Sequence, residues 1–399
     1  MKGFFAKKKH LFIKVYALFF FIVGKLPRKK KLIIFESYLG KQFSCNPRAI
    51  YEYLKLHPEK YDFEMVWSIN KKYEGRFKEF DVKYSKRFSL DWLWKMATAQ
   101  YWITNSRLPL WLPKPKGTIY IQTWHGTPLK KLANDMDEVH MPGTSTNRYK
   151  QNFLKEARKW DYLISPNSYS TEIFKQAFNF KKTIIESGYP RNDCLINLDN
   201  EEFKMKIKET LKIKNDKRVV LYAPTWRDND FYSKGNYKFS LKFDLSRLQK
   251  RFGKNTVILF RMHYLINENF NFDKYDGFAV DVTNYPDIRE LYIISDILIT
   301  DYSSVFFDFA NLNKPMIFYT YDLEKYKNDL RGFYFDFEKK APGRIVTNEN
   351  DLFNELAKQI KQPQTNENFK IFKKEFCVIE DGNSSKRFVE SILDKKIET

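Results

Sequence analysis

The chain has 399 residues, a length that exceeds one ordinary domain and suits two domains of medium size. Hydrophobic residues make up 43% of the sequence and aromatic residues 18%, which is enough for packed cores and excludes a disordered chain. The formal net charge of +21 favours a polyanionic partner such as nucleic acid, an anionic membrane surface or a phosphorylated substrate.

The first predicted segment, residues 1–31, combines an apolar run with flanking cations. Lys7–Lys9 precede the run Leu11–Val23, and Lys25 and Arg28–Lys31 follow it. The run is shorter than the ~20 residues that span a bilayer, and no small-residue cleavage site follows it. We therefore expect a helix that lies in the membrane interface beside an anionic surface. A helix buried against its own domain is the alternative.

Short β-rich runs then alternate with helical patterns, which predicts parallel sheets with crossover helices. Strands are expected in the first half at Leu32–Glu36, Phe63–Trp67, Tyr101–Thr104, Thr118–Trp124, Tyr162–Ser165 and Thr183–Ser187. In the second half they are expected at Val219–Ala223, Thr256–Arg261, Phe278–Val282, Ile297–Thr300 and Met316–Tyr319. The sequence thus predicts an α/β protein with a first domain at 32–200, a second at 201–380, and a terminal helix within 381–399 that crosses back to the first.

Five polar clusters each follow the carboxyl end of a predicted strand. They begin at His125, Gly188, Pro224, Arg261 and Asp301. Open parallel sheets bind ligands in the crevice outside the carboxyl ends of their strands. Clusters from both halves are therefore expected to face one cleft between the two domains.

His125 is the first candidate catalytic residue. Gly126 and Pro128 after it predict a tight turn with accessible backbone N–H groups. An imidazole in such a turn can act as a general base near neutral pH. The alternative is a histidine that only stabilises the turn through a hydrogen bond.

Arg227, Arg261 and His263 are candidates for a cationic pocket that binds a diphosphate. An ordinary surface ion pair and a half-buried histidine would explain the same pattern. Arg191 is a further candidate, although it could instead pair locally with Asp193.

Ser303 and Ser304 stand where a strand passes into a helix, and either could be the N-cap. A helix N-terminus with serine hydroxyls is a possible anion site, and a plain serine N-cap is the alternative. Asp308 lies one turn further on, where it could hold the hydroxyls of a ribose or a polyol.

Several familiar sites are missing from the sequence. It contains neither GxGxxG nor GxxxxGK[ST], which disfavours a dinucleotide-binding site and a P-loop. The three cysteines lack metal-site spacing, and Asp135–Asp137 reads as solvated surface, so no metal site is expected. Leu108–Leu112, a Leu- and Pro-rich stretch, is a candidate for a second membrane-facing surface.

The polar clusters resemble those of the CDP-glycerol glycerophosphotransferases, which act in teichoic acid and capsule synthesis. The resemblance extends from about residue 30 to 390 and rests on six motifs: Trp124–Thr127, Gly188–Arg191, Ala223–Arg227, Arg261–His263, Asp301–Ser304 with Asp308, and Glu380–Ser385. It implies a GT-B-like architecture, with two Rossmann-like domains and the active site in the cleft between them.

The resemblance also implies roles for the matching residues. His125 would be the base that deprotonates the acceptor hydroxyl, and His263 a second catalytic histidine. The implied substrate-binding residues are Gly126, Thr127, Pro128, Leu129, Arg191, Pro224, Thr225, Arg227, Arg261, Ser303, Ser304 and Asp308. Side-chain cations and a helix N-terminus would neutralise charge in phosphoryl transfer, and no cofactor is expected.

The donor implied by the family is CDP-glycerol, and the acceptor is a polyprenyl-diphosphate-linked saccharide at the cytoplasmic face of the membrane, with the enzyme bound peripherally. Many polymerases of the family are longer, so the length of this chain leans toward a primase or a capsule enzyme. A ribitol phosphate transferase shares the motifs, and a GT-B glycosyltransferase using a nucleotide sugar shares the fold. A protein that only binds nucleic acid or membrane would leave the strand-end clusters unexplained, so nucleic acid is not an expected partner. The sequence does not determine the oligomeric state.

Overall fold

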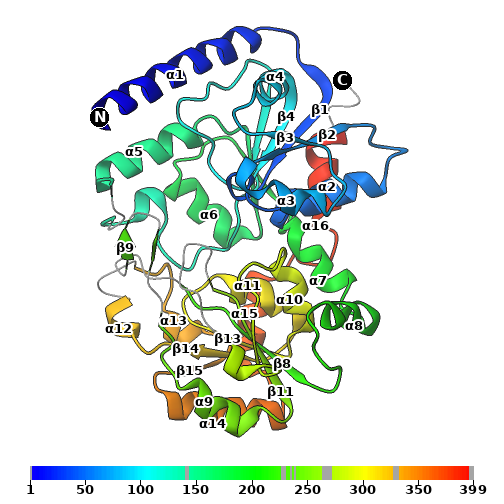
Figure 1. Ribbon diagram of the computed structural model, residues 1–399, viewed down its shortest axis with the longest axis vertical. Helices are drawn as coiled ribbons and strands as arrows, with labels where there is room; N and C mark the ends of the chain where they lie inside the picture. The colour runs from blue at the N-terminus through cyan, green and yellow to red at the C-terminus, as the bar shows by residue number, and fades with distance from the viewer. Residues whose placement is uncertain are drawn as a thin grey trace.

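The computed structural model describes residues 2–139, 143–225, 231–233, 236–237, 240–262, 272–326 and 332–394. For residues 2–10 and for the segments between 231 and 237 it describes only the backbone. Two parallel sheets with flanking helices form the molecule, one above the other (Figure 1).

The upper sheet is built from the first half of the chain, in the order β3-β2-β1-β4-β5-β6-β7, and all its pairs are parallel. Its strands are β1 (Lys29–Glu36), β2 (Glu64–Ile69), β3 (Tyr84–Lys86), β4 (Ala99–Thr104), β5 (Ile119–Gln122), β6 (Tyr162–Ser165) and β7 (Thr183–Glu186). The six strands expected in this half are confirmed. The sequence did not reveal β3, because three residues at the sheet edge are too few to show an apolar pattern.

The lower sheet has the order β12-β11-β8-β13-β14-β15, again with parallel pairs only. Its strands are β8 (Arg218–Tyr222), β11 (Thr256–Phe260), β12 (Ala279–Asp281), β13 (Ile297–Thr300), β14 (Met316–Tyr319) and β15 (Arg344–Val346). The five expected strands are confirmed, and the short edge strand β15 was missed for the same reason as β3. A separate antiparallel pair joins β9 (Phe231–Ser233) and β10 (Asn236–Tyr237).

Alternate residues of each central strand pack into different cores. Leu32 and Ile34 of β1 enter one apolar cluster and Ile33 and Phe35 enter another, as expected for a strand covered on both faces. The helices that provide this cover are α1 (Lys2–Val23), α2 (Cys45–Leu56), α3 (Glu74–Lys78), α4 (Leu90–Thr98), α5 (Thr146–Ala157), α6 (Ser168–Ala177), α7 (Asp193–Asn197), α8 (Glu201–Thr210), α9 (Leu245–Phe252), α10 (Ile288–Ile294), α11 (Val305–Phe309), α12 (Leu323–Lys325), α13 (Phe337–Lys340), α14 (Glu349–Lys361), α15 (Glu367–Phe376) and α16 (Ser384–Val389).

The last helix, α16, lies against the upper sheet although the preceding helices cover the lower one (Figure 1). Phe388 and Val389 are buried in a core cluster of the first half. The Asp193 carboxylate accepts hydrogen bonds from the Ser384 and Ser385 N–H groups at 2.8 and 2.7 Å, which fixes the helix start. The domain limits drawn from the sequence stay a prediction; in the chain, Glu201–Lys217 comes between β7 of the upper sheet and β8 of the lower one.

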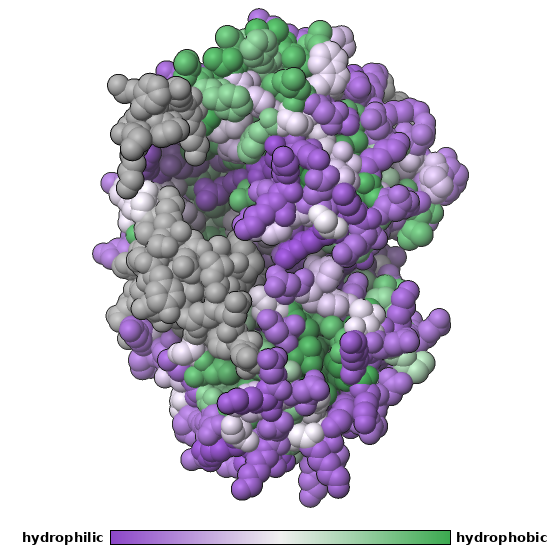
Figure 2. Space-filling view, viewed as in Figure 1, coloured by the Kyte–Doolittle hydropathy of each residue, from purple (hydrophilic) through white to green (hydrophobic). Residues whose placement is uncertain are grey.

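Helix α1 packs on the first half along one face and leaves the other face open. Tyr16 and Phe20 are buried, with ring centroids 6.5 and 6.3 Å from that of Trp92. Phe12 and Phe19 remain 62% and 58% exposed, and apolar side chains gather at this end of the molecule (Figure 2). The helix therefore packs against its own domain along one face, as in the alternative considered from the sequence, and leaves apolar side chains exposed on the other. Among the described residues, no helix has both the length and the apolar composition required to cross a bilayer.

The expectation of a second membrane-facing surface at Leu108–Leu112 is wrong for both terminal leucines. Leu108 and Leu112 are 4% and 1% exposed, and they share a core cluster with Tyr16 and Phe20 of α1. The stretch is therefore part of the core against which α1 packs.

Candidate functional site

A cavity of about 250 Å³ lies between the two halves, at the carboxyl ends of strands from both sheets. Among the residues predicted from the sequence, those lining it are His125, Arg191, Pro224, Arg261, Ser303, Ser304 and Asp308. Lining residues that the sequence did not single out include Tyr38, Gln42, Ser44, Cys45, Thr283, Asp287, Arg289 and Tyr292. The strand-end clusters of both halves thus meet at one cavity.

His125 sits in a turn whose backbone is held in an uncommon conformation. Trp124 has a φ of +50°, in the left-handed region of backbone conformation that residues other than glycine rarely adopt. The buried Asn46 side chain holds this turn, because its Nδ2 donates to the Thr123 and Trp124 carbonyls at 2.9 and 3.2 Å. Its Oδ1 accepts from the Arg191 N–H at 3.1 Å. One amide side chain therefore joins the His125 turn to the Arg191 turn.

The imidazole of His125 has one defined tautomer. Its Nδ1 lies 2.7 Å from the Asn105 carbonyl oxygen, which can only accept, so Nδ1 carries the proton. Nε2 is therefore the unprotonated nitrogen, able to take a proton from a substrate. Burial among the cavity walls, opposed by the Asn105 bond and assisted by the charges of Arg191 and Arg107, lowers the pKa of His125 to about 4. Because the ring is also exposed to the cavity, water there moderates the shift, and the imidazole is neutral at pH 7.

Gly126 brings the two halves into contact beside His125. A Cβ at this position would lie 2.9 Å from the Ser304 Oγ, so only glycine allows the approach without a shift. Thr127, Pro128 and Leu129 do not line the cavity. Leu129 is instead buried in the core of the lower half, and its carbonyl accepts from the Tyr334 N–H at 2.9 Å. A role for Leu129 in substrate contact is therefore not supported by its position.

Arg191 and Asp308 form a buried ion pair across the two halves. The Arg191 Nη2 donates to Asp308 at 2.9 Å, and its Nη1 to the Cys45 Sγ at 3.3 Å. Burial alone would lower the pKa of Arg191, but the charge of Asp308 raises it well above its usual value. The alternative local pair with Asp193 is wrong, because the Asp193 carboxylate binds the start of α16.

Arg261 gives the cavity a positive charge. Its Nη1 donates to the carbonyls of Val282, Thr283 and Tyr285 at 2.5 to 2.9 Å, and it makes no ion pair within the described part of the chain. Burial lowers the pKa of Arg261, yet a guanidinium stays protonated at neutral pH. A phosphate in the cavity would meet this charge without competition from a bound carboxylate.

The backbone on the lower side of the cavity is held by side chains of neighbouring strands. The Thr225 N–H donates to the Asp301 carboxylate at 2.8 Å, which ties the turn after β8 to the turn after β13. Ser304 occupies the N-cap position of α11, but its hydroxyl does not cap that helix. The Ser303 and Ser304 hydroxyls make no hydrogen bond with a described residue, so both are available to a ligand.

A second cluster of charged side chains, which the sequence did not predict, joins the two halves at the cavity wall. Arg289 binds the Asp287 carboxylate through Nε at 2.9 Å to both oxygens, and the Arg48 Nη1 of α2 donates to it at 3.0 Å. Burial raises the pKa of Asp287, but the charges of Arg289 and Arg48 outweigh it and hold the pKa well below its usual range. No sequence signal could have connected Arg48 with residues more than half a chain away.

Arg227 and His263 lie outside the described residues, so their predicted roles are not placed in the cavity. No group of three or more His, Cys, Asp or Glu side chains with metal-ligand geometry occurs where the structure describes the chain.

A sequence model of the CDP-glycerol:poly(glycerophosphate) glycerophosphotransferases matches residues 18–394. The chain belongs to this family. The predicted family is thereby confirmed, and the enzyme class with it.

Two relatives match nearly end to end. A teichoic acid poly(glycerol phosphate) polymerase of Bacillus spizizenii is 59% identical over 97% of this chain and 98% of its own length. A teichoic acid glycerol-phosphate transferase of Staphylococcus aureus is 47% identical over 94% and 95%. By contrast, this glycerophosphotransferase covers only 52% of a Bacillus subtilis polymerase that is 56% identical. Polymerases thus occur at both lengths, and the length of this chain does not support the expectation of a primase.

Solved structures confirm the GT-B-like architecture. The wall teichoic acid polymerase TagF matches with a TM-score of 0.86 and 43% identity, over 100% of this chain and 96% of that one. A putative UDP-N-acetylglucosamine 2-epimerase from Listeria monocytogenes matches at a TM-score of 0.53 and 14% identity over 93% and 98%, which shows a shared fold alone.

Proposed function

We propose that this enzyme transfers glycerol phosphate from CDP-glycerol to a hydroxyl of a polyprenyl-diphosphate-linked acceptor in teichoic acid synthesis, and releases CMP. The observation that carries the proposal is that one cavity contains both a neutral His125, with Nε2 available, and the Arg261 guanidinium, which makes no ion pair with a described residue. Phosphoryl transfer needs a positioned nucleophile and neutralisation of developing charge, and this pairing supplies both.

The proposed reaction begins when His125 Nε2 accepts the proton of the acceptor hydroxyl. The acceptor oxygen attacks the phosphorus that carries glycerol, and a new P–O bond forms. The bond from this phosphorus to the bridging oxygen breaks, and CMP leaves with that oxygen. Arg261 and the hydroxyls of Ser303 and Ser304 stabilise the diphosphate charge. The scheme uses no metal ion, because side-chain cations neutralise the diphosphate charge.

Repeated addition to one acceptor is the mode we propose, since a relative of the same length at 59% identity is a poly(glycerol phosphate) polymerase. Glycerol is favoured over ribitol as the transferred polyol. The ribitol-phosphate polymerases of Bacillus spizizenii and Staphylococcus aureus are only 27 to 31% identical to this chain.

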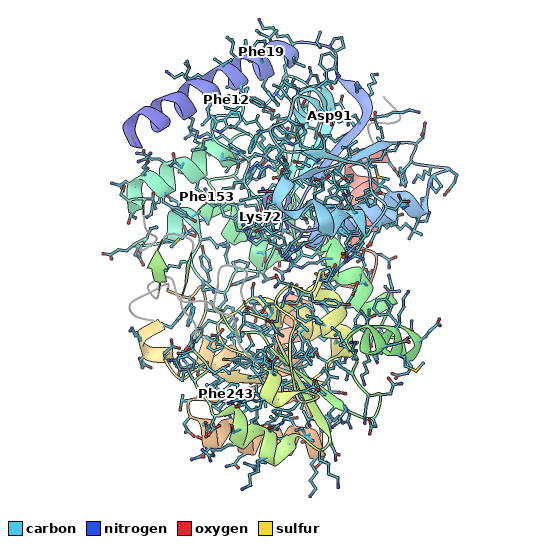
Figure 3. The ribbon with its side chains drawn as sticks, in the orientation of Figure 1. Phe12, Phe19, Lys72, Asp91, Phe153 and Phe243 are labelled. Atoms are coloured by element: carbon cyan, nitrogen blue, oxygen red, sulfur yellow. The ribbon has the colours of Figure 1, made fainter. Side chains whose placement is uncertain are left out.

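Helix α1 is the proposed contact with the cytoplasmic face of the membrane. Phe12 and Phe19 lie on α1 at the outer end of the first half (Figure 3), and Leu11 and Leu18 are also more than half exposed. Lys25, Lys29 and Lys30 follow the helix, are exposed, and would meet anionic head groups. The face is suited to binding at the membrane surface.

The central experiment measures CMP release with CDP-glycerol, CDP-ribitol and sugar nucleotides, in the presence of a lipid-linked acceptor. We expect turnover with CDP-glycerol and its loss by at least ~100-fold in His125→Ala. His57→Ala, a histidine half exposed at the end of α2, is the matched control and should behave as wild type. Turnover only with sugar nucleotides, or undiminished turnover in His125→Ala, would refute the proposal.

Membrane binding is tested separately by sedimentation with vesicles of phosphatidylglycerol. Phe12→Asp with Phe19→Asp should leave the protein in the supernatant, whereas Leu56→Asp, which changes a still more exposed apolar residue on α2, should not. Sedimentation of the double variant at the wild-type level would contradict the role of α1.

A further inference from the structure

Arg107 is a cation beside the catalytic base that the proposed donor site does not use. It follows Asn105 by two residues, and the Asn105 carbonyl is the group that binds Nδ1 of His125. The charge of Arg107, after the larger effects of burial and of Arg191, helps to lower the pKa of His125. Arg191 and Arg261, by comparison, line the donor cavity itself, and Arg107 does not.

The Arg107 guanidinium is held by aromatic rings, with no anion bound to it. Its Cζ lies 4.3 Å from the ring centroid of Phe153 and 5.5 Å from that of Tyr149, both on α5. Figure 3 labels Phe153 on this helix, in the upper half above the division between the halves. These cation–π contacts position the guanidinium without using its N–H donors.

Arg107 makes neither an ion pair nor a hydrogen bond from its side chain with any described residue. The buried carboxylate of Glu156 is in the same region, but its oxygens accept from the Leu108 N–H at 3.2 Å, the Tyr120 hydroxyl at 2.9 Å and the Trp160 Nε1 at 2.5 Å. A partly buried, oriented guanidinium with unused donors is suited to bind a phosphate through two parallel bonds.

We propose that Arg107 binds the phosphate of the terminal glycerol phosphate unit of the acceptor. The attacking hydroxyl is at the other end of the same unit, so this contact places it against Nε2 of His125. The inference rests on the proposed function and deepens it, since it assigns a subsite for an anionic, already primed acceptor. An acceptor without a terminal phosphate gains nothing from Arg107.

The test compares two acceptors, a lipid-linked disaccharide that carries one glycerol phosphate unit and the same disaccharide without it. Arg107→Ala should raise KM for the primed acceptor by about 10- to 100-fold, the effect expected for lost charge-assisted hydrogen bonds. KM for CDP-glycerol, the thermal midpoint and the KM for the unprimed acceptor should stay unchanged. Assays at pH 8 keep His125 neutral in every variant.

Arg148→Ala is the matched control, because it removes the same charge from an exposed position one residue before Tyr149. Arg107→Lys keeps the charge but loses the planar fork, so its KM for the primed acceptor should lie between those of wild type and Arg107→Ala. Arg107→Gln replaces the alanine variant in the assay if that variant unfolds.

An unchanged KM for the primed acceptor in Arg107→Ala would overturn the inference, as would an equal loss with both acceptors or a fall in kcat alone. Failure of the proposed function gives a different result, because the wild-type enzyme would then release no CMP from CDP-glycerol with either acceptor.

Discussion

Replacing Asn46 by alanine should weaken both the fold and the reaction, because this buried side chain joins the two turns of the site. The change removes two bonds to the Thr123 and Trp124 carbonyls and one from the Arg191 N–H. At about 1 kcal/mol for each of the three lost hydrogen bonds, the free energy of unfolding falls by about 3 kcal/mol. For a domain of about 150 to 250 residues, that corresponds to a fall of about 6 to 12 °C in the thermal midpoint.

The catalytic effect of Asn46→Ala follows from the strained backbone at Trp124. Without the two donors, the turn can relax from its φ of +50°, and His125 moves away from the acceptor position. We expect kcat for CMP release to fall by about 100-fold, while KM for CDP-glycerol changes by less than about threefold. Asn200→Ala removes an exposed N-cap on α8 and serves as the control, with stability lowered by about 1 kcal/mol and kcat unchanged. A wild-type kcat in Asn46→Ala, or a midpoint within about 2 °C of wild type, would refute the reasoning.

Three further predictions concern the charged groups of the site and its surroundings. Because the pKa of His125 is lowered below its usual value, kcat/KM should fall much less from pH 8 to 5.5 than the loss of about 90% expected for a base with a pKa of about 6.5; a loss of that size would contradict the lowered pKa. Burial raises the pKa of Glu380 to about 8, so its contribution to stability is complete below its unfolded pKa of about 4.5 and is lost as pH rises through 8. Urea unfolding of Glu380→Gln should therefore show a gain over wild type of about 2 to 4 kcal/mol at pH 9 that vanishes near pH 5; equal stability at both pH values would contradict it. Asp308→Asn leaves the buried Arg191 without its counter-charge and should lower the free energy of unfolding by about 3 kcal/mol, and a loss below about 1 kcal/mol would show that the pair is not the main support.

Much of the fold could be predicted from local patterns. Ile33–Phe35 and Val219–Leu221 are continuous apolar runs, and such runs predict strands that are covered on both faces. The missed strands, β3 and β15, have three residues each and lie at sheet edges, where a strand needs little apolar sequence. The apolar run Leu11–Val23 predicted a helix, but only packing could determine that the side of Tyr16 and Phe20 is covered.

The site was predictable where a polar cluster follows a strand and was not where partners come from distant segments. His125, Arg261 and Ser304 reach the cavity because strand ends place them there. The pairing of Arg191 with Asp308 joins residues in different halves, so the local alternative with Asp193 had equal support from the sequence. Asn46, in the first turn of a helix, gave no signal at all, since its importance arises from three contacts with other segments.

The crossing segments determine how the protein can be divided for study. Leu129, from the first half, is buried in the core of the second, and Phe388 and Val389, from the end of the chain, are buried in the core of the first. A chain cut after Asn200 would leave each fragment with an apolar segment outside its own core and a vacant place within it. The two fragments should therefore be recovered in soluble form only when they are produced together, and a fragment meant to fold as the first half alone must carry the residues of α16 as a graft.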